Sequence, residues 1–321
     1  MISDRFRLLF TLASILTVIS CTNPLKEPPG GISGKVFLEP APPPGEGWAY
    51  VRIFNSLADD TVRSNPTTYE FAFDNLKVEG LVSEYNIEAF KGGYITSRST
   101  VLIEAGATRG NYILTLRRGL RRDTTFQDSV SPHQDYAGCS DTYISASDST
   151  AVYGFEERMV IAGGQPDLVK RGLIYFDFSW QQYYPPLDTL DMEIELATLS
   201  IYIDSVRTTA SVEIAIFNLE HFFDEDTASW ASNGGNPWPD GPGGSYGVLS
   251  SDTLTVSSIS FGWQEFSIKR IADEWLASSR PAAMMIKLVD ESRQSSIFFR
   301  SSDNDLTVLN PNLHLAIYYL Q

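Results

Sequence analysis

The sequence predicts an all-β protein made of two β-sandwich domains, the second of which contains one short helix. Three observations lead to this fold class. Apolar and polar residues alternate in short runs, which is the spacing of half-buried strands. Turn-rich segments with many glycines and prolines separate these runs. The length of 321 residues suits about two domains.

Composition and charge exclude several classes of protein. With 43% apolar residues and 20% charged residues, the chain is too apolar to be disordered throughout. Its net charge of −16 argues against nucleic-acid binding, because such a surface repels a phosphate backbone. Two cysteines cannot form a disulfide framework, and the three widely spaced histidines do not form a metal centre. We expect Cys139 to be a small buried core residue.

The first twenty residues have the pattern of a signal peptide. Arg5 and Arg7 precede an apolar run over 8–19, which is too short to span a bilayer. The run ends in Val18-Ile19-Ser20-Cys21, which resembles the lipobox of bacterial lipoproteins. The resemblance implies cleavage before Cys21, lipidation of its thiol and amine, and an exported protein anchored at the cell envelope by lipid alone. Thr22 rather than Asp after Cys21 favours the outer membrane in a cell with two membranes. The alternative is an ordinary cleaved signal followed by a chance cysteine.

The segment 21–31 is rich in proline and glycine, which predicts a tether. The pattern over 32–118 predicts a small antiparallel β-sandwich. The alternating runs of this domain lie at 34–38, 49–54, 69–73, 85–90, 99–103 and 111–116. Phrases such as Tyr69-Glu70-Phe71-Ala72-Phe73 and Lys91-Gly92-Gly93-Tyr94 resemble the carboxypeptidase regulatory-like family, a transthyretin-like sandwich. The resemblance implies an accessory domain without catalytic residues.

A basic segment follows this domain, with four arginines among residues 117–122. We interpret 119–126 as a solvated linker between the domains. The alternative is a local binding site for an anionic polymer or a lipid headgroup.

Residues 127–321 predict a larger, jelly-roll-type β-sandwich of about nine strands. Within it, residues 268–276 carry apolar side chains at helical spacing and predict the short amphipathic helix. Seven phrases in this region occur in the order that is typical of the DNRLRE domain, which is grouped with carbohydrate-binding module family 96 and the disaggregatase-related repeats. They are Asp141–Ile144, Val152–Gly154, Arg171–Asp177, Ala197–Tyr202, Ala228–Trp230, Trp263–Lys269 and Pro311–Tyr318. The chain departs from the family pattern at Ser229 and Ser267.

This second resemblance implies polysaccharide binding, which needs aromatic rings to stack on sugar C–H groups and polar groups to bind hydroxyls. The Gly- and Pro-rich loop over 230–246 carries Trp238 and Tyr246 as candidate ligand residues. Lys170, Arg171 and Arg300 form a candidate basic patch for the carboxylate of a uronic acid if their strand ends are neighbours. The alternatives are a packing role for the aromatic residues and ordinary salt bridges for the cations.

Two acidic segments have enough oxygen ligands to suggest calcium. They are the run Asp224, Glu225 and Asp226, which is our candidate metal site, and the turn 303–305. Neither has the spacing of a known calcium loop, and both also suit solvated acidic loops.

The chain has no recognisable catalytic motif, so we expect a protein that is not an enzyme. The leading hypothesis is a lipoprotein of the cell envelope that binds polysaccharide through its C-terminal sandwich. One alternative is a structural or adhesive protein that docks other envelope proteins. The other is a polysaccharide lyase or hydrolase accessory protein, for which His221 beside Asp224 is the one candidate neighbourhood.

Overall fold

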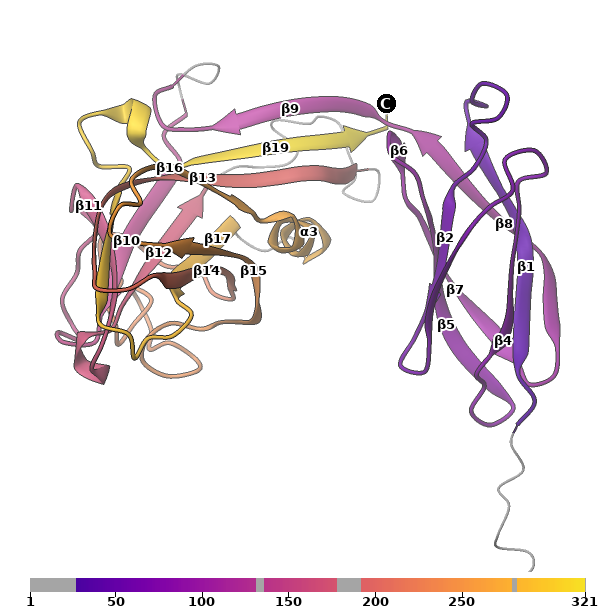
Figure 1. Cartoon of the computed structure of the whole chain (residues 1–321), viewed down its shortest axis with the longest axis horizontal. Coiled ribbons are helices and arrows are strands. Elements are labelled where there is room, and N and C mark those ends of the chain that lie inside the picture. Colours follow the sequence, from indigo (N-terminus) through magenta and orange to yellow (C-terminus); the bar gives the residue numbers. More distant parts are fainter. Residues whose placement is uncertain (1–26, 131–135, 178–191, 279–281, 321) are drawn as a thin grey trace, which may run out of the picture. The chain divides into compact units, whose positions relative to one another are not determined.

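The structure is a computed structural model that describes residues 27–130, 136–177, 192–278 and 282–320 (Figure 1). The signal peptide over 1–20, Cys21 and most of the tether lie outside the described residues. The chain divides into two compact units, Met1–Arg118 and Gly119–Gln321. The described residues contain no helix long and apolar enough to cross a membrane.

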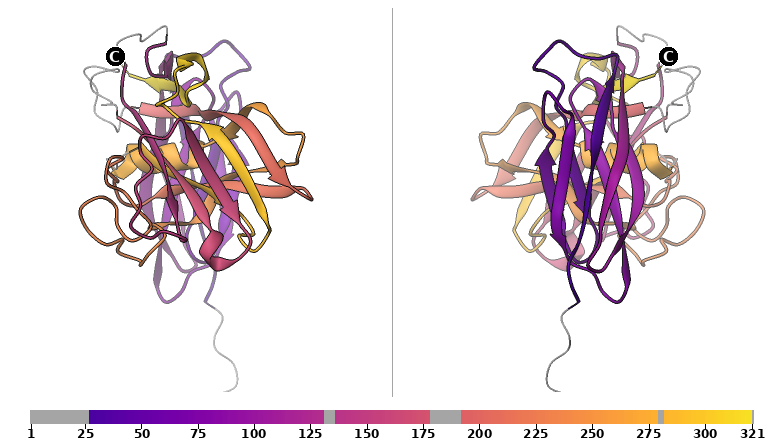
Figure 2. Two further views of the ribbon diagram at one scale, coloured as in Figure 1. Left: turned by 90° about the vertical axis from the view of Figure 1, so that its left-hand side faces the viewer. Right: turned by 90° about the vertical axis from the view of Figure 1, so that its right-hand side faces the viewer.

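Unit 1 is a sandwich of two four-stranded sheets, whose strands run side by side in the right-hand view of Figure 2. One sheet has the order β4 (Glu70–Leu76), β1 (Gly30–Glu39), β8 (Thr108–Arg118) and β6 (Tyr94–Ile95). The other has the order β3 (Asp59–Arg63), β2 (Tyr50–Phe54), β5 (Val82–Phe90) and β7 (Ser97–Glu104). Alternate residues from both sheets form one buried core, including Ile53 and Ile87 from one and Val36 and Phe73 from the other.

The first unit differs from the expected antiparallel sandwich in one respect. Strands β1 and β8 pair in parallel, from Gly31 opposite Thr108 to Glu39 opposite Arg117. Parallel neighbours need a long connection, and the chain between these two strands supplies the other six strands of the unit.

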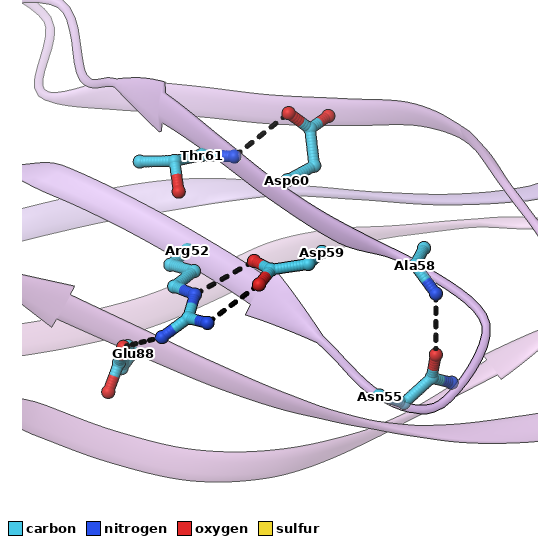
Figure 3. Close-up of polar contacts among 7 residues, drawn as sticks. All are labelled: Arg52, Asn55, Ala58, Asp59, Asp60, Thr61 and Glu88. Atoms are coloured by element: carbon cyan, nitrogen blue, oxygen red, sulfur yellow. Dashed lines mark hydrogen bonds and ion pairs between the residues drawn. The ribbon is translucent and has the colours of Figure 1, made fainter. Parts of the chain in front are cut away.

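Ion pairs connect the strands on the outer face of the β3–β2–β5 sheet (Figure 3). The Arg52 guanidinium donates two hydrogen bonds to Asp59, from Nε (2.8 Å) and Nη2 (2.7 Å), and a third from Nη1 to Glu88 (3.3 Å). The hydrogen bond from Arg52 lowers the pKa of Asp59. Asn55 Oδ1 closes the β2–β3 hairpin by accepting hydrogen bonds from the amides of Leu57 and Ala58.

Unit 2 is the larger sandwich, and its strands belong to one continuous eleven-stranded sheet (Figure 2, left). The first strands are β9 (Leu120–Phe126), β10 (Cys139–Ser145), β11 (Arg158–Gly163), β12 (Lys170–Phe176), β13 (Met192–Thr208) and β14 (Val212–Leu219). The others are β15 (Tyr246–Val256), β16 (Gly262–Ser267), β17 (Ala282–Leu288), β18 (Ser295–Arg300) and β19 (Asn312–Tyr319). Two 3-10 turns, η1 (Pro166–Leu168) and η3 (Thr307–Leu309), lie in the connections.

The sheet of unit 2 encloses its own core because its path bends between β11 and β12. A single residue pair, Ala162 with Lys170, joins these two strands. Side chains on both sides of the bend belong to the same buried cluster, for example Ile174 and Ile286 on one side and Ile201 and Phe299 on the other.

The helix α3 (Lys269–Ser278) lies beside the strand layers of unit 2 (Figure 1). Its buried residues are Ile271, Ala272, Trp275 and Leu276, which belong to the main core of the unit. The predicted fold class, β-sandwiches with one short helix, is therefore confirmed in the described residues.

The prediction of a linker over 119–126 is wrong, because most of this segment is the strand β9. It pairs with β19 from Leu120 opposite Tyr319 to Phe126 opposite Leu313. Arg121 and Arg122 lie on the exposed part of the strand, while Thr124 and Phe126 are buried at its end. Because only the end of the strand is buried, it has no long alternation of apolar and polar residues. The arginines therefore suggested a solvated linker and not a strand.

Candidate functional site

The Gly- and Pro-rich loop that the sequence marks as a ligand site forms a second, smaller core. Trp238 of the loop, together with Phe223 and Ala228 from the chain just before it, packs against Leu173 and Met285 on the sheet. The Trp238 side chain is 2% exposed, and its Nε1 donates a hydrogen bond to the carbonyl oxygen of Ser229 (2.9 Å). The prediction that Trp238 contacts a ligand is therefore wrong, because no face of its ring is open to solvent.

Arg171 and Tyr246 hold this loop against the sheet. The Arg171 guanidinium lies 4.9 Å from the ring centre of Trp230 and 5.4 Å from that of Tyr246. It donates two hydrogen bonds to Glu291, at 2.7 and 2.9 Å, and one to the carbonyl oxygen of Gly243 at 2.6 Å. Burial acts to raise the pKa of Glu291, but the bonds and charge of Arg171 outweigh it, so this pKa is lowered. Arg171 thus has a packing role, contrary to the prediction, whereas Tyr246 is only partly buried and remains a predicted ligand residue.

The predicted cluster of Lys170, Arg171 and Arg300 does not form. Lys170 lies opposite Ala162, and Ala162 lies opposite Ser296. Arg300 lies opposite Arg158. This pair is four residues from the Ala162–Ser296 pair, which is about 13 Å along the strands. Arg300 and Arg158 instead share Asp204, at 2.5 and 3.0 Å.

Lys170 does share a groove with a cation at its far end, Arg207, although not with the predicted one. The pairing of strands places Lys170, Ala162, Ser296 and Arg207 in one row across four strands. This row forms part of a groove of about 650 Å³, whose other lining residues include Thr208, Thr209, Gln294 and Ser295. Small residues in the middle and a cation at each end make the groove suitable for an anionic ligand.

Both cations of the groove contact aromatic rings. Lys170 Nζ lies 4.8 Å from the ring centre of Tyr143, and the Arg207 guanidinium lies 5.1 Å from that of Phe298. Within the described ranges, neither cation forms an ion pair with a carboxylate. Desolvation lowers the pKa of Lys170, and a bound anion would favour its charged form.

An aromatic pair lies further along the outer face of β13. Tyr202 and Trp263 are opposite each other in the β13–β16 pairing, and their rings meet edge to face with centres 5.7 Å apart. The Trp263 side chain is 40% exposed. Ile201 and Ile203, on either side of Tyr202, are fully buried, so Tyr202 points away from the core.

We use the name β13 face for the surface formed by Tyr202, Trp263, Phe298, Arg207 and Lys170. The residues between its two ends also point outward, because Asp204 is paired with arginines and Phe298 contacts Arg207. Sequence reasoning missed Tyr202, Trp263 and Arg207 as candidates. The alternation Leu199-Ser200-Ile201-Tyr202-Ile203 was the available signal, since it places Tyr202 opposite the buried isoleucines.

Unit 1 has a hollow of about 880 Å³ with a different character. Its lining includes Lys35, Glu70 and Arg63. Lys35 pairs with Glu70 at 3.5 Å, and the Arg63 guanidinium lies 4.0 Å from the ring centre of Trp48. Since its oppositely charged side chains compensate each other, this hollow favours an anionic ligand less than the β13 face does.

The predicted calcium ligands Asp224, Glu225 and Asp226 do not converge. Asp224 Oδ1 accepts a hydrogen bond from the Asp226 amide (3.1 Å), which makes a local turn. Glu225 turns away from both and accepts a hydrogen bond from the Asp141 amide (2.6 Å). In the part of the chain that the structure describes, no three His, Cys, Asp or Glu side chains form a group that could hold a metal ion. Asp224, Glu225 and Asp226 therefore do not form a calcium site together, as the sequence had suggested.

No family model matches the chain, and no curated protein matches it. The two family resemblances of the sequence thus remain predictions.

Three solved structures illustrate the structural similarities. The Bacillus anthracis TIE protein is 9% identical with a TM-score of 0.23, over 86% of this chain. SGBP-B of the Bacteroides ovatus mixed-linkage glucan utilization locus, in complex with a mixed-linkage heptasaccharide, is 8% identical with a TM-score of 0.16, over 87% of this chain. The chain spans about half the length of these two, at 49% and 51%. A structure of carbohydrate-binding modules from the beta-sandwich super family is 12% identical with a TM-score of 0.16, over 93% of this chain and 100% of that one. At these TM-scores the similarity defines neither family nor function.

Proposed function

We propose that this protein binds polysaccharide through the β13 face of unit 2. The observation that carries the proposal is the outward-facing pair Tyr202 and Trp263, on the same sheet face as the groove with Lys170 and Arg207. Aromatic rings stack on the C–H faces of sugars, and the few polar groups around them fix the orientation.

The groove favours a polysaccharide that contains uronic acid. A carboxylate is the sugar substituent that Lys170 and Arg207 would recognise, because charge-assisted hydrogen bonds to carboxylates are stronger than those to hydroxyls. Thr208 and Gln294 line the same groove and supply neutral hydrogen-bonding groups for hydroxyls.

We propose further that binding occurs without catalysis. Asp204 is the carboxylate in the middle of the β13 face, and two arginines hold it in ion pairs. A catalytic carboxylate must contact the reacting groups of the substrate, and both oxygens of Asp204 are already engaged by arginines.

The lipobox-like sequence before Cys21 supports the proposal that the protein is exported and anchored at the cell envelope by lipid, at the outer membrane. Incorporation of radiolabelled palmitate into the expressed chain tests the anchor. We expect labelling of the natural chain and none of a Cys21→Ser variant. Equal labelling of both would contradict lipidation at Cys21.

Affinity electrophoresis in gels that contain neutral or uronic-acid polysaccharides tests the binding. We expect the natural chain to be retarded and Trp263→Ala to be retarded about tenfold less, the effect of losing a ring contact of about 1.4 kcal/mol. The matched control is Phe155→Ala, since Phe155 is 74% exposed but is not part of the β13 face. Retardation by no polysaccharide, or an equal loss in both variants, would contradict the proposal.

A second comparison tests the preference for acidic sugars. Replacing both Lys170 and Arg207 by glutamine should remove binding to uronic-acid polymers and leave binding to neutral polymers within about twofold. Lys269→Gln is the control, because Lys269 pairs with Asp273 on the surface of α3. If the Lys269→Gln variant has the same effect, the preference comes from overall charge and not from the groove.

A further inference from the structure

A buried carboxyl group on β10 has an oxygen atom without a partner. The Asp141 side chain is 1% exposed. Its Oδ2 accepts a hydrogen bond from the Ser302 amide (2.6 Å), whereas Oδ1 has no hydrogen-bond partner. Burying a carboxylate oxygen without a partner is costly, so this oxygen is a candidate for binding a proton or a cation.

A second buried oxygen without a partner belongs to Asn310, which contacts the same residue, Ser302. Asn310 is fully buried, and its Nδ2 donates a hydrogen bond to the Ser302 carbonyl oxygen (2.9 Å). Asn310 Oδ1 has no hydrogen-bond partner. Asp141 and Asn310 therefore bind the amide and the carbonyl of one residue, and each keeps one oxygen unused.

Glu225 adds a second carboxylate to this place. Its Oε1 accepts a hydrogen bond from the Asp141 amide (2.6 Å), which brings the loop over 224–226 to β10. Gly154 permits this approach, since a Cβ atom there would collide with the backbone of Glu225. Asp303 lies beside Ser302, and its charge acts on both Asp141 and Glu225.

The carboxyl groups are unfavourable neighbours when nothing binds them. Burial, together with the charges of Asp303 and Asp128, raises the pKa of Asp141 to about 7. Burial and the charge of Asp141 raise the pKa of Glu225 to about 8. Such a pair is stabilised either by protons or by a cation.

We propose that Asp141, Glu225 and Asn310 bind one calcium ion. Calcium takes six to eight oxygen ligands, which include carboxylates, amide carbonyls, backbone carbonyls and water. Two carboxylates with one amide oxygen fit this preference without a third acidic ligand, so the proposal is compatible with the lack of a three-carboxylate group in the described residues.

The proposed site differs from the run that the sequence suggested. Of Asp224, Glu225 and Asp226, it uses Glu225 alone, and its other ligands come from β10 and from the connection before β19. With only two charged ligands and hydrogen bonds already made by each, we expect a dissociation constant of about 10⁻⁴ to 10⁻³ M, the range of extracellular calcium modules.

Isothermal titration of the EDTA-treated full chain with calcium chloride tests the proposal. We expect one calcium ion per chain, weaker binding of magnesium, and a rise in the thermal midpoint with calcium concentration. Asp141→Asn should weaken calcium binding at least tenfold. The control Asp224→Asn should leave it within about twofold.

The metal-free Asp141→Asn variant supplies a second readout. An amide removes the buried charge, so its thermal midpoint without metal should equal or exceed that of the natural chain, and calcium should no longer raise it. Glu225→Gln replaces this variant if Asp141→Asn does not fold. Absence of saturable calcium binding, or equal binding by the Asp141→Asn and Asp224→Asn variants, would overturn the proposal and leave protons or water as the partners of these oxygens. Because glycan binding is measured separately, either proposal can fail without the other.

Discussion

Two tryptophans of unit 2, one in a loop and one in a strand, differ strongly in their exposure to solvent. Trp238 lies in a Gly- and Pro-rich loop and is 2% exposed, whereas Trp263 lies in strand β16 and is 40% exposed. The loop folds over the outer face of the sheet and buries Trp238 in a core of its own. Strand alternation leaves Trp263 on the face opposite Phe266, which is fully buried. A loop position therefore does not imply a contact with ligand.

The largest expected effect is the loss of stability in Trp238→Ala. Removing a fully buried tryptophan lowers the free energy of unfolding by about 3–5 kcal/mol. Urea denaturation followed by circular dichroism measures this change. If the variant is as stable as the natural chain but binds polysaccharide poorly, Trp238 contacts the ligand and is not a packing residue.

A pH effect should come from Asp141 and Glu225, the buried carboxyl groups of the proposed calcium site. The pKa values of Asp141 and Glu225, about 7 and about 8, lie above their ordinary values of 3.8 and 4.5. The folded chain holds these protons more tightly than the unfolded chain. The metal-free protein should therefore be most stabilised by them below about pH 4, lose this stability as the pH rises to about 8, and change little above it.

Urea denaturation in EDTA at pH 5 and pH 8 measures this loss. The double variant with Asp141→Asn and Glu225→Gln is the control, because it should show a smaller fall over the same interval. An equal fall in both proteins would assign the pH dependence to other groups.

A smaller loss of stability is expected from Arg171→Met. The change leaves Glu291 without its two hydrogen bonds from Arg171, although Lys287 remains 3.5 Å away, so we expect a loss of about 2 kcal/mol. Arg293→Met is the matched control, since its ion pair with Asp290 is exposed and worth about 0–1 kcal/mol. Similar losses in the two variants would show that Arg171 does not hold the loop.

The smallest effect on stability is expected from Trp263→Ala, at about 1 kcal/mol or less, because its ring is already partly in water. Among the single variants described, Trp263→Ala should have the largest effect on polysaccharide binding. A stability loss like that of Trp238→Ala would mean that Trp263 is a packing residue, and the β13 face would lose its main support.

Much of the fold could be predicted from the sequence, because alternation and turns are local signals. The six predicted runs of unit 1 lie in six of its strands, and the predicted helix is α3. The strand β3 was missed because Asp59–Arg63 has no buried position and is held by pairing with β2 and by the Arg52–Asp59 ion pair. Such an edge strand carries no hydrophobic pattern.

The candidate site was less predictable, because it depends on which strands are neighbours. Lys170 and Arg207 share a groove only because both pair toward Ser296 through the register of β11, β18 and β13. Arg300 belongs to the same sheet but is displaced along it by that register. The sequence shows which residues could bind a ligand, whereas the long-range pairing of strands decides which of them line the same groove.

The pairing of β9 with β19 delays the folding of unit 2 until its last strand has been synthesised. These are the first and the last strands of the unit, so their hydrogen bonds require the ends of a long segment to meet. Closing such a loop costs entropy that no local contact repays, which slows folding. Until β19 leaves the ribosome, Leu313, Leu315 and Ile317 are missing from the core, and the unit cannot close. Late completion of this kind keeps a newly made chain extended for longer, which would suit the export that we propose for this protein.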